Sequence, residues 1–176
     1  MVQANIFSSV STLFKLRCLM IHLSLVLISY FFMEFVAWSN HKYVMHGFLW
    51  KWHKDHHRKD HQNTLPEKTE EKWFEKNDLF FLIYAIPAIL LMIIGFMLNY
   101  LPLIFISIGI TLYGFTYFII HDIIIHKRLP LSFLRIKSNF YIRAVIKAHT
   151  AHHWPKSKND FRNFGLLIFP SRFFKP

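Results

Sequence analysis

Three long apolar segments, residues 19–38, 79–98 and 103–120, alternate with polar stretches along the chain. A helix of twenty residues is about 30 Å long, which matches the hydrocarbon core of a bilayer. Pro87 and Gly95 lie inside the second segment, and membrane helices tolerate both because neighbouring groups satisfy the freed backbone atoms. The pattern predicts three transmembrane helices and an all-α, multi-pass fold.

The polar stretches determine how these helices are connected. Residues 99–102 form a tight turn between the second and third segments, whereas the stretches 39–78 and 121–176 are long. This connectivity places the end of the first span, the start of the second and the end of the third on one side of the membrane. Residues 1–18 mix apolar and polar side chains and are compatible with an interfacial helix. We expect residues 1–176 to be a single membrane-embedded domain.

Ten of the twelve histidines follow a duplicated pattern. An HX4H pair is followed by an HX2HH triplet, and the same order returns about seventy residues later. The ten residues are His41, His46, His53, His56, His57, His121, His126, His149, His152 and His153. They lie in the His-rich segments 41–57 and 121–153, just beyond the ends of the predicted spans, so the pattern predicts one His-rich site at one membrane face.

The residue type and the spacing point to metal binding. Neutral imidazole is a ligand for iron, zinc and copper. In HX2HH, helical geometry puts all three side chains on one face. In HX4H the two side chains are about 140° apart on an ideal helix, so they bind different metals, or the helix ends or bulges between them. Two copies of five ligands fit two metal ions with positions left open for substrate or oxygen.

Two acidic residues near the histidines are candidates for orienting them. Glu34 is an acid inside the first span. Placing a charge inside a membrane is energetically costly, so an acid there usually has a function. Glu34 lies about two helical turns before His41, so we expect it to orient a ligating histidine, and Asp122 is a second candidate for that role. The two remaining histidines are expected elsewhere: His22 at the membrane interface and His61 in a solvated loop over residues 58–78.

Composition and charge narrow the class of protein. The chain is 53% hydrophobic, with a net charge of +11 and one cysteine, Cys18, which excludes a thiolate cluster. Residues 41–78 carry eight Lys or Arg and residues 127–176 carry eleven, against two before the first span. By the positive-inside rule the chain lies in the cell membrane with its histidines facing the cytoplasm. The basic residues suit anionic lipid headgroups, and we find no nucleic-acid-binding motif.

Several runs around the histidines resemble the bacterial β-carotene 3-hydroxylases, a branch of the membrane fatty acid hydroxylase and sterol desaturase superfamily. The runs are Met33-Glu-Phe-Val-Ala37, His41-Lys-Tyr-Val-Met-His46-Gly47, Trp52-His-Lys-Asp-His-His57, Phe74-Glu-Lys-Asn-Asp-Leu79, Tyr113-Gly114, Tyr117-Phe118, His121-Asp122, His126-Lys-Arg-Leu-Pro130, Ala148-His149 and His152-His153. The resemblance covers roughly residues 30–170. Its Phe-Gly pair near the C-terminus is kept at Phe164-Gly165, whereas the residues before that pair differ.

The resemblance implies a non-haem diiron monooxygenase that takes electrons from reduced ferredoxin and its reductase. Such an enzyme uses O2 to hydroxylate C3 of the β-ionone rings of β-carotene, which gives β-cryptoxanthin and then zeaxanthin. The metal ligands would be drawn from the ten histidines, with zinc as an ion that can replace iron on purification. The carotenoid would enter from the bilayer, and the chain has no Gly-rich nucleotide fingerprint for binding NAD(P)H itself.

Two other functions compete with this interpretation. The first is a fatty acid or sterol hydroxylase or desaturase of the same superfamily, because His spacing does not distinguish between lipid substrates. The second is a membrane metal-binding or transport protein. Transport sites lie near the bilayer midplane between spans, whereas these histidines lie at the ends of spans, so the pattern favours an enzyme.

Overall fold

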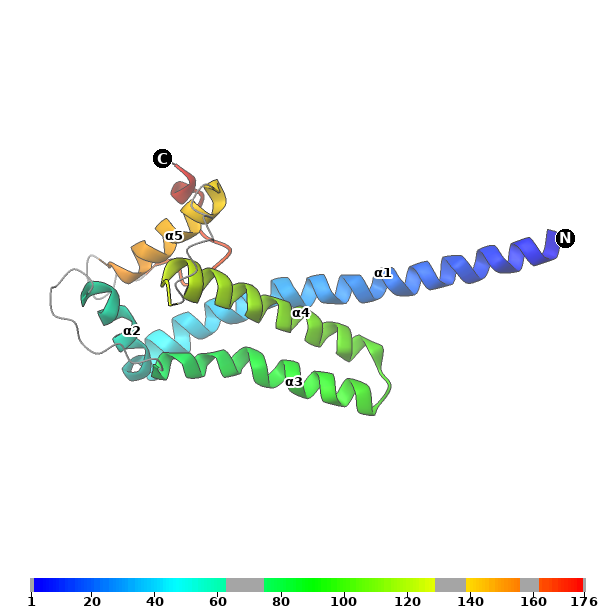
Figure 1. Cartoon of the computed structure of the whole chain (residues 1–176), viewed down its shortest axis with the longest axis horizontal. Coiled ribbons are helices and arrows are strands. Elements are labelled where there is room, and N and C mark those ends of the chain that lie inside the picture. Colours follow the sequence, from blue (N-terminus) through cyan, green and yellow to red (C-terminus); the bar gives the residue numbers. More distant parts are fainter. Residues whose placement is uncertain (1, 63–74, 129–138, 156–161, 176) are drawn as a thin grey trace.

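The computed structural model describes residues 2–62, 75–128, 139–155 and 162–175, and in these ranges the protein is helical, with no strand (Figure 1). For residues 2–10, 55 and 58–62 it describes the backbone alone. The elements in chain order are α1 (Val2–Ser39), η1 (Asn40–Phe48), α2 (Trp50–Gln62), η2 (Lys76–Phe81), α3 (Leu82–Met97), α4 (Leu101–Tyr117), η3 (Phe118–Ile125), α5 (Phe140–His153) and η5 (Ser171–Phe174). The predicted all-α fold is confirmed.

The first helix is longer than the sequence pattern suggested. α1 runs without a break from Val2 to Ser39 and extends well past α3 and α4 (Figure 1). The helix expected over residues 1–18 is continuous with the first apolar span in the described residues, because the segment 2–39 contains no Gly or Pro to end it.

α3 and α4 form the antiparallel hairpin that the tight turn predicted. Asn99 adopts a left-handed conformation with φ 49°, and Pro102 starts α4 where its missing N–H costs nothing. α4 packs against both α1 and α3. Three stretches, Ser11–Phe48, Lys76–Met97 and Leu101–Ile125, are long and apolar enough to cross a membrane.

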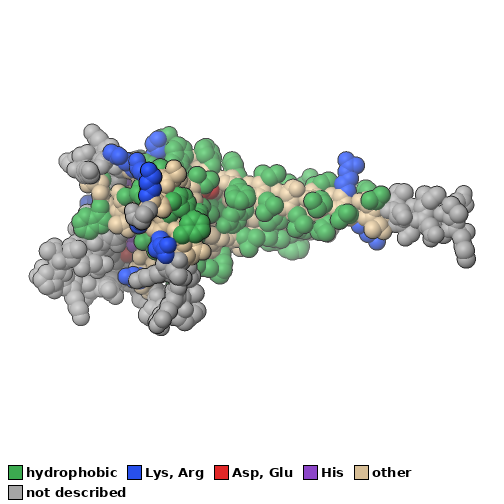
Figure 2. All heavy atoms as spheres, turned by 90° about the horizontal axis from the view of Figure 1, so that it is seen from above, with side chains coloured by type: hydrophobic (Ala, Val, Ile, Leu, Met, Phe, Trp, Pro, Cys, Tyr) green, Lys and Arg blue, Asp and Glu red, His purple; other side chains and the backbone are tan. Residues whose placement is uncertain are grey.

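The surface of these helices is apolar, whereas part of their interior is polar. Figure 2 shows hydrophobic side chains covering the long part of the molecule, and Phe31, Ile89 and Phe115 are each more than half exposed. Ser107 and Tyr113 are fully buried between the helices. This distribution is typical of helices that face lipid and keep their polar groups in the bundle interior.

α1 and α4 approach each other closely at Gly109. A Cβ atom built there would overlap Ser29 Oγ and lie 2.5 Å from the Val26 carbonyl oxygen. Small residues at helix contacts allow such an approach in membrane proteins. The His-bearing elements η1 and η3 follow directly after the C-terminal ends of α1 and α4.

The His-bearing elements gather at one end of the molecule, beside the C-terminus and far from the N-terminus (Figure 1). α5 begins after Asn139, whose side chain accepts from the Tyr141 and Ile142 backbone N–H groups. The prediction of a solvated loop over residues 58–78 is wrong at the C-terminal end of that range, because Asn77 is buried in η2. Residues 63–74 of that loop lie outside the described residues, and His61 belongs to α2.

Candidate metal centre

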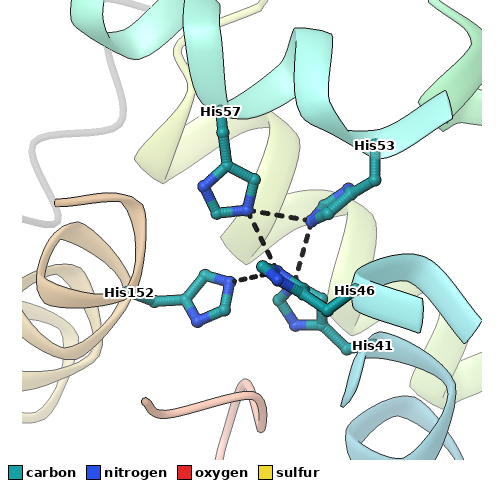
Figure 3. A group of neighbouring side chains, drawn as sticks. All are labelled: His41, His46, His53, His57 and His152. Carbon is teal, nitrogen blue, oxygen red and sulfur yellow. Dashed lines mark hydrogen bonds between the residues drawn. The ribbon is translucent and has the colours of Figure 1, made fainter. Parts of the chain in front are cut away.

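The structure brings nine of the ten histidines into two adjacent groups. In each group the facing ring nitrogens all lie within 4.8 Å of one another. The first group is His41, His46, His53, His57 and His152 (Figure 3), and the second is His56, His121, His126 and His149. Segments about a hundred residues apart therefore converge on one site.

Both HX4H pairs lie in π-helices, which explains their spacing. η1 holds His41 and His46. η3 holds His121, and His126 caps its C-terminal end, where the His126 backbone N–H donates to the His121 carbonyl at 3.0 Å. A π-helix closes its hydrogen bonds between residues i and i+5, so two residues five apart lie on the same face. Each pair accordingly falls into a single group. Of the two alternatives left open by the sequence, the structure selects the bulged helix.

The two HX2HH triplets exchange their middle histidines. On α2, His53 and His57 belong to the first group, whereas His56 between them belongs to the second. On α5 the assignment is reversed, because His149 belongs to the second group and His152 to the first. Each triplet thus contributes histidines to both groups. The duplicated spacing in the sequence therefore corresponds to two similar His groups in the structure.

His153, the tenth histidine, lies beside the second group. It is 1% exposed, its ring stacks on His57 with centroids 4.2 Å apart, and it lies 4.5 Å from the His149 ring. His153 is the third residue of its triplet, as His57 is of the other. Because its ring contacts His57 of the first group and His149 of the second, it lies between the two groups.

Ring-to-oxygen contacts fix the tautomers of three histidines in the first group. The contacts are His41 Nδ1 to Phe164 O at 2.9 Å, His152 Nδ1 to Arg162 O at 2.6 Å and His53 Nδ1 to Asn77 Oδ1 at 2.7 Å. A carbonyl oxygen only accepts, so each Nδ1 carries the proton and donates it. Each Nε2 is therefore a bare lone pair that points into the group.

These bare nitrogens fit a bound cation. His41 Nε2 and His53 Nε2 lie 3.1 Å apart in a buried site, and neither can donate to the other (Figure 3). Two ligands about 2.0–2.1 Å from one metal ion lie roughly 2.9–3.4 Å apart at octahedral to tetrahedral angles. In the second group, His126 Nε2 and His149 Nε2 are also 3.1 Å apart. His56 Nε2 there is buried with no hydrogen-bond partner among the described residues.

Burial keeps His53, His56, His149 and His152 neutral, the form that binds metal. It lowers the pKa of His53, His56 and His149 well below its usual value, and the neighbouring histidines add to this. Burial, with His46 nearby, lowers the pKa of His152 to about 3. At neutral pH protons therefore do not compete for these nitrogens.

The sequence profile of the fatty acid hydroxylase family matches residues 26–175, which is most of the chain and includes every histidine of both groups. The chain belongs to the fatty acid hydroxylase family. It is therefore a hydroxylase, an oxidoreductase, and the two His groups are its candidate metal centre. The predicted relationship to β-carotene hydroxylases is also confirmed, by the relatives described next.

The hydroxylase is similar to curated relatives in bacteria and plants. It is 36% identical over 140 residues to the β-carotene hydroxylase of Paracoccus sp., with 78% of each chain covered. It is 37% identical over 138 residues to that of Pantoea ananas, covering 78% of this chain and 71% of the relative. It is 39% identical over 141 residues to the chloroplastic β-carotene 3-hydroxylase of Gentiana lutea, covering 40% of that longer protein. No solved structure gives a significant match.

Charged side chains surround the second group of the hydroxylase, in contrast with the neutral oxygens around the first. His56 Nδ1 lies 3.6 Å from the Glu75 carboxylate, and His121 Nδ1 lies 3.5 Å from Asp122. Arg128 contacts Asp122 at 3.3 Å and Glu75 at 3.2 Å, and it also donates to Asp78. One guanidinium therefore holds the two carboxylates that face His56 and His121 of the second group.

Replacing Arg128 with Gln should weaken metal binding at the second group by about 10–100-fold, as loss of partners that orient ligands does. The carboxylates would lose their shared counter-charge and shift away from His56 and His121. The first group should keep its affinity, because its ring partners are neutral oxygens. Metal titration of the purified hydroxylase would measure both affinities.

Lys127 provides the matched control for Arg128. It precedes Arg128, is exposed, and makes no ion pair with a described residue. Lys127→Gln removes the same charge and should leave both affinities unchanged. Equal weakening of both groups in Arg128→Gln would contradict a role specific to the second group.

The structure gives the two acidic candidates different surroundings. Asp122 lies next to the His121 ring, as expected. Glu34 instead accepts from Tyr113 and from three backbone N–H groups of the C-terminal segment. His22 stacks on Phe105, with ring centroids 4.6 Å apart, between α1 and α4.

Sequence reasoning missed several residues that hold the histidines. Asn77, Glu75 and Arg128 act through side chains, and Tyr117 stacks on the His121 ring with centroids 4.8 Å apart. A signal was present for all four, because each lies in a run that carries part of the resemblance: 74–79, 117–118 or 126–130. The backbone carbonyls that fix tautomers in the first group leave no signal in a sequence.

Proposed function

We propose that this hydroxylase acts on β-carotene, placing a hydroxyl group at C3 of each β-ionone ring to form β-cryptoxanthin and then zeaxanthin. The observation that carries the proposal is the pair of buried His groups at the end of three apolar helices. Curated relatives at 36–37% identity are bacterial β-carotene hydroxylases, and the Gentiana lutea relative is a β-carotene 3-hydroxylase.

In this proposal the ten histidines hold two iron ions, and zinc fits the same nitrogens on purification. Bound iron would supply the oxygen-activating redox chemistry that side chains lack. The chain's own residues position the ligands. Backbone oxygens orient His41 and His152 in the first group, and carboxylates face His56 and His121 in the second.

The surroundings of the site support an apolar substrate. A small cavity lies where α1, α3 and α4 meet the His-bearing elements, and it touches His41 of the first group and His149 of the second. Met45, Tyr84 and Tyr117 line the same cavity. The apolar helices that end at the His groups carry exposed Phe, Ile and Leu side chains, so a carotenoid dissolved in the bilayer would reach the His end of the molecule without crossing water.

The electron donor and the orientation are further parts of the proposal. Exposed basic side chains gather at the His end of the molecule: Lys51, Lys54, Lys127, Arg143 and Lys147 (Figure 2). They suit the docking of an acidic reduced ferredoxin and also the headgroups of anionic lipid. Their charge supports a cytoplasmic location for the His end of a protein in the cell membrane.

A second function has support from the family name itself. The matching family is named for fatty acid hydroxylation, and the two His groups do not distinguish one lipid C–H bond from another. The names of the curated relatives favour a carotenoid substrate. Identifying the hydroxylated product distinguishes a carotenoid from a fatty acid substrate.

Expression of the chain in a β-carotene-producing bacterium should convert the pigment to β-cryptoxanthin and zeaxanthin, measured by chromatography. The double variant His56→Ala/His152→Ala, which removes one ligand from each group, should leave β-carotene unchanged. Purified protein should require both O2 and reduced ferredoxin. Unchanged pigment from membrane-inserted protein, even with ferredoxin and its reductase supplied, would rule out this substrate and favour another lipid.

A further inference from the structure

Glu34 is a buried acid, and the binding of metal by the ten histidines does not explain its presence. It lies in α1 within the first apolar stretch, is 3% exposed, and pairs with no basic side chain among the described residues. An acid so placed is costly unless its oxygens are satisfied. Its partners therefore indicate what it does.

Both oxygens of Glu34 are satisfied by the C-terminal segment and by α4. Oε1 accepts from three consecutive backbone N–H groups, those of Leu166 at 2.8 Å, Leu167 at 2.9 Å and Ile168 at 3.0 Å. Oε2 accepts from the Tyr113 hydroxyl at 2.6 Å. Successive N–H groups that converge on one oxygen form a concave anion site in the backbone.

Gly165 is required for this arrangement. A Cβ atom at position 165 would lie 2.8 Å from Glu34 Oε1 and 2.7 Å from the Ile168 carbonyl oxygen. Both distances are shorter than side-chain carbons adopt, so the backbone can wrap around the carboxylate because residue 165 has no side chain.

The same segment supplies the backbone oxygens that orient the first His group. The Phe164 carbonyl accepts from His41 Nδ1 at 2.9 Å, two residues before the first N–H group bound by Glu34. The Arg162 carbonyl accepts from His152 Nδ1 at 2.6 Å. The second group has different ring partners, Glu75 and Asp122, so movement of the segment would affect one group and not the other.

We propose that Glu34 is a positioning residue for the first His group, acting through residues 162–168, which it anchors by their backbone N–H groups. The anchor keeps the Phe164 and Arg162 carbonyls against His41 and His152, so that their Nε2 lone pairs point to one metal position. The inference deepens the proposed function and rests on it where it concerns metal. The anchoring of the segment itself does not depend on metal.

The first test measures metal affinity in Glu34→Leu and Gly165→Ala. Each variant breaks the anchor from one side and should weaken binding at the first group by at least about tenfold, as loss of an orienting partner does. Glu34→Gln keeps one oxygen acceptor for the three N–H groups, so its affinity should fall between that of wild type and Glu34→Leu. Ser107→Ala removes another buried polar group of the bundle, away from the segment, and should leave both affinities unchanged.

Combination with ligand variants identifies the affected group. At a metal concentration that just saturates the wild type, Glu34→Leu/His56→Ala should hold no ion, because each group is damaged once. Glu34→Leu/His41→Ala should keep one ion, because both changes act on the first group. The opposite result would overturn the proposal.

The second test follows the segment itself by limited trypsin digestion. Arg162 and Arg172 flank the anchored residues and are exposed. Cleavage at these sites should be several-fold faster in Glu34→Leu and Gly165→Ala than in wild type and Ser107→Ala, with metal or without. Unchanged cleavage and affinity in folded Glu34→Leu and Gly165→Ala would overturn the anchor. If the wild type bound no metal and Glu34→Leu and Gly165→Ala were still cleaved faster than the wild type, the proposed metal centre would be refuted and the anchoring of the segment by Glu34 would stand.

Discussion

Replacing His53 and His56 together with Ala is expected to remove both metal ions, although the two residues lie within one turn of α2. His53 belongs to the first group and His56 to the second, so the double change damages both. Replacing His56 and His149 should instead remove one ion, although they lie on different helices, because both belong to the second group. Metal content of the purified proteins measures the difference.

Turnover should fall to background in both of these double variants. Residues that merely orient a ligand contribute about 10–100-fold, so loss of ligands should exceed a hundredfold. If each HX2HH triplet served its own metal, the stoichiometries would be exchanged: His53→Ala/His56→Ala would keep one ion and His56→Ala/His149→Ala none. That outcome would refute the exchange of middle histidines between the two triplets.

Replacing Gly109 with Ala is expected to destabilise the helix bundle, against the usual effect of this substitution. Gly to Ala within a helix ordinarily stabilises by about 0.5–1 kcal/mol. At Gly109 the added methyl group would overlap Ser29 Oγ and approach the Val26 carbonyl, so α1 would have to move away from α4. Overpacking of this kind costs about 1–3 kcal/mol, and Gly109→Leu should cost more.

Gly114, one and a half turns further along α4, provides the control. A Cβ there would meet Tyr84 Cβ at 3.5 Å, which is ordinary contact, so Gly114→Ala should leave stability unchanged or slightly raised. Thermal unfolding in detergent and the amount of protein in the membrane fraction would compare the variants. Equal stability of the two Ala variants would mean that α1 and α4 do not pack closely at Gly109.

The sequence by itself determined the class of fold and singled out the histidines that the structure gathers into two groups. Long apolar segments predict membrane helices because a bilayer excludes unsatisfied backbone, and this constraint is local to each segment. Ten histidines in a duplicated spacing predict a metal site because the chemistry belongs to the residue type. The Asn-Tyr-Leu-Pro turn at residues 99–102 likewise predicted the α3–α4 hairpin from local backbone preferences alone.

The tertiary structure decided how these ligands are grouped. Sequence spacing left the HX4H pairs ambiguous, because an ideal helix separates residues five apart, and the π-helical geometry of η1 and η3 is a property of the packed fold. The exchange of His56 and His152 between groups depends on how α2 and α5 face each other. Glu34 met backbone N–H groups rather than a histidine ring, since contacts to the main chain of a distant segment leave no trace in residue identity.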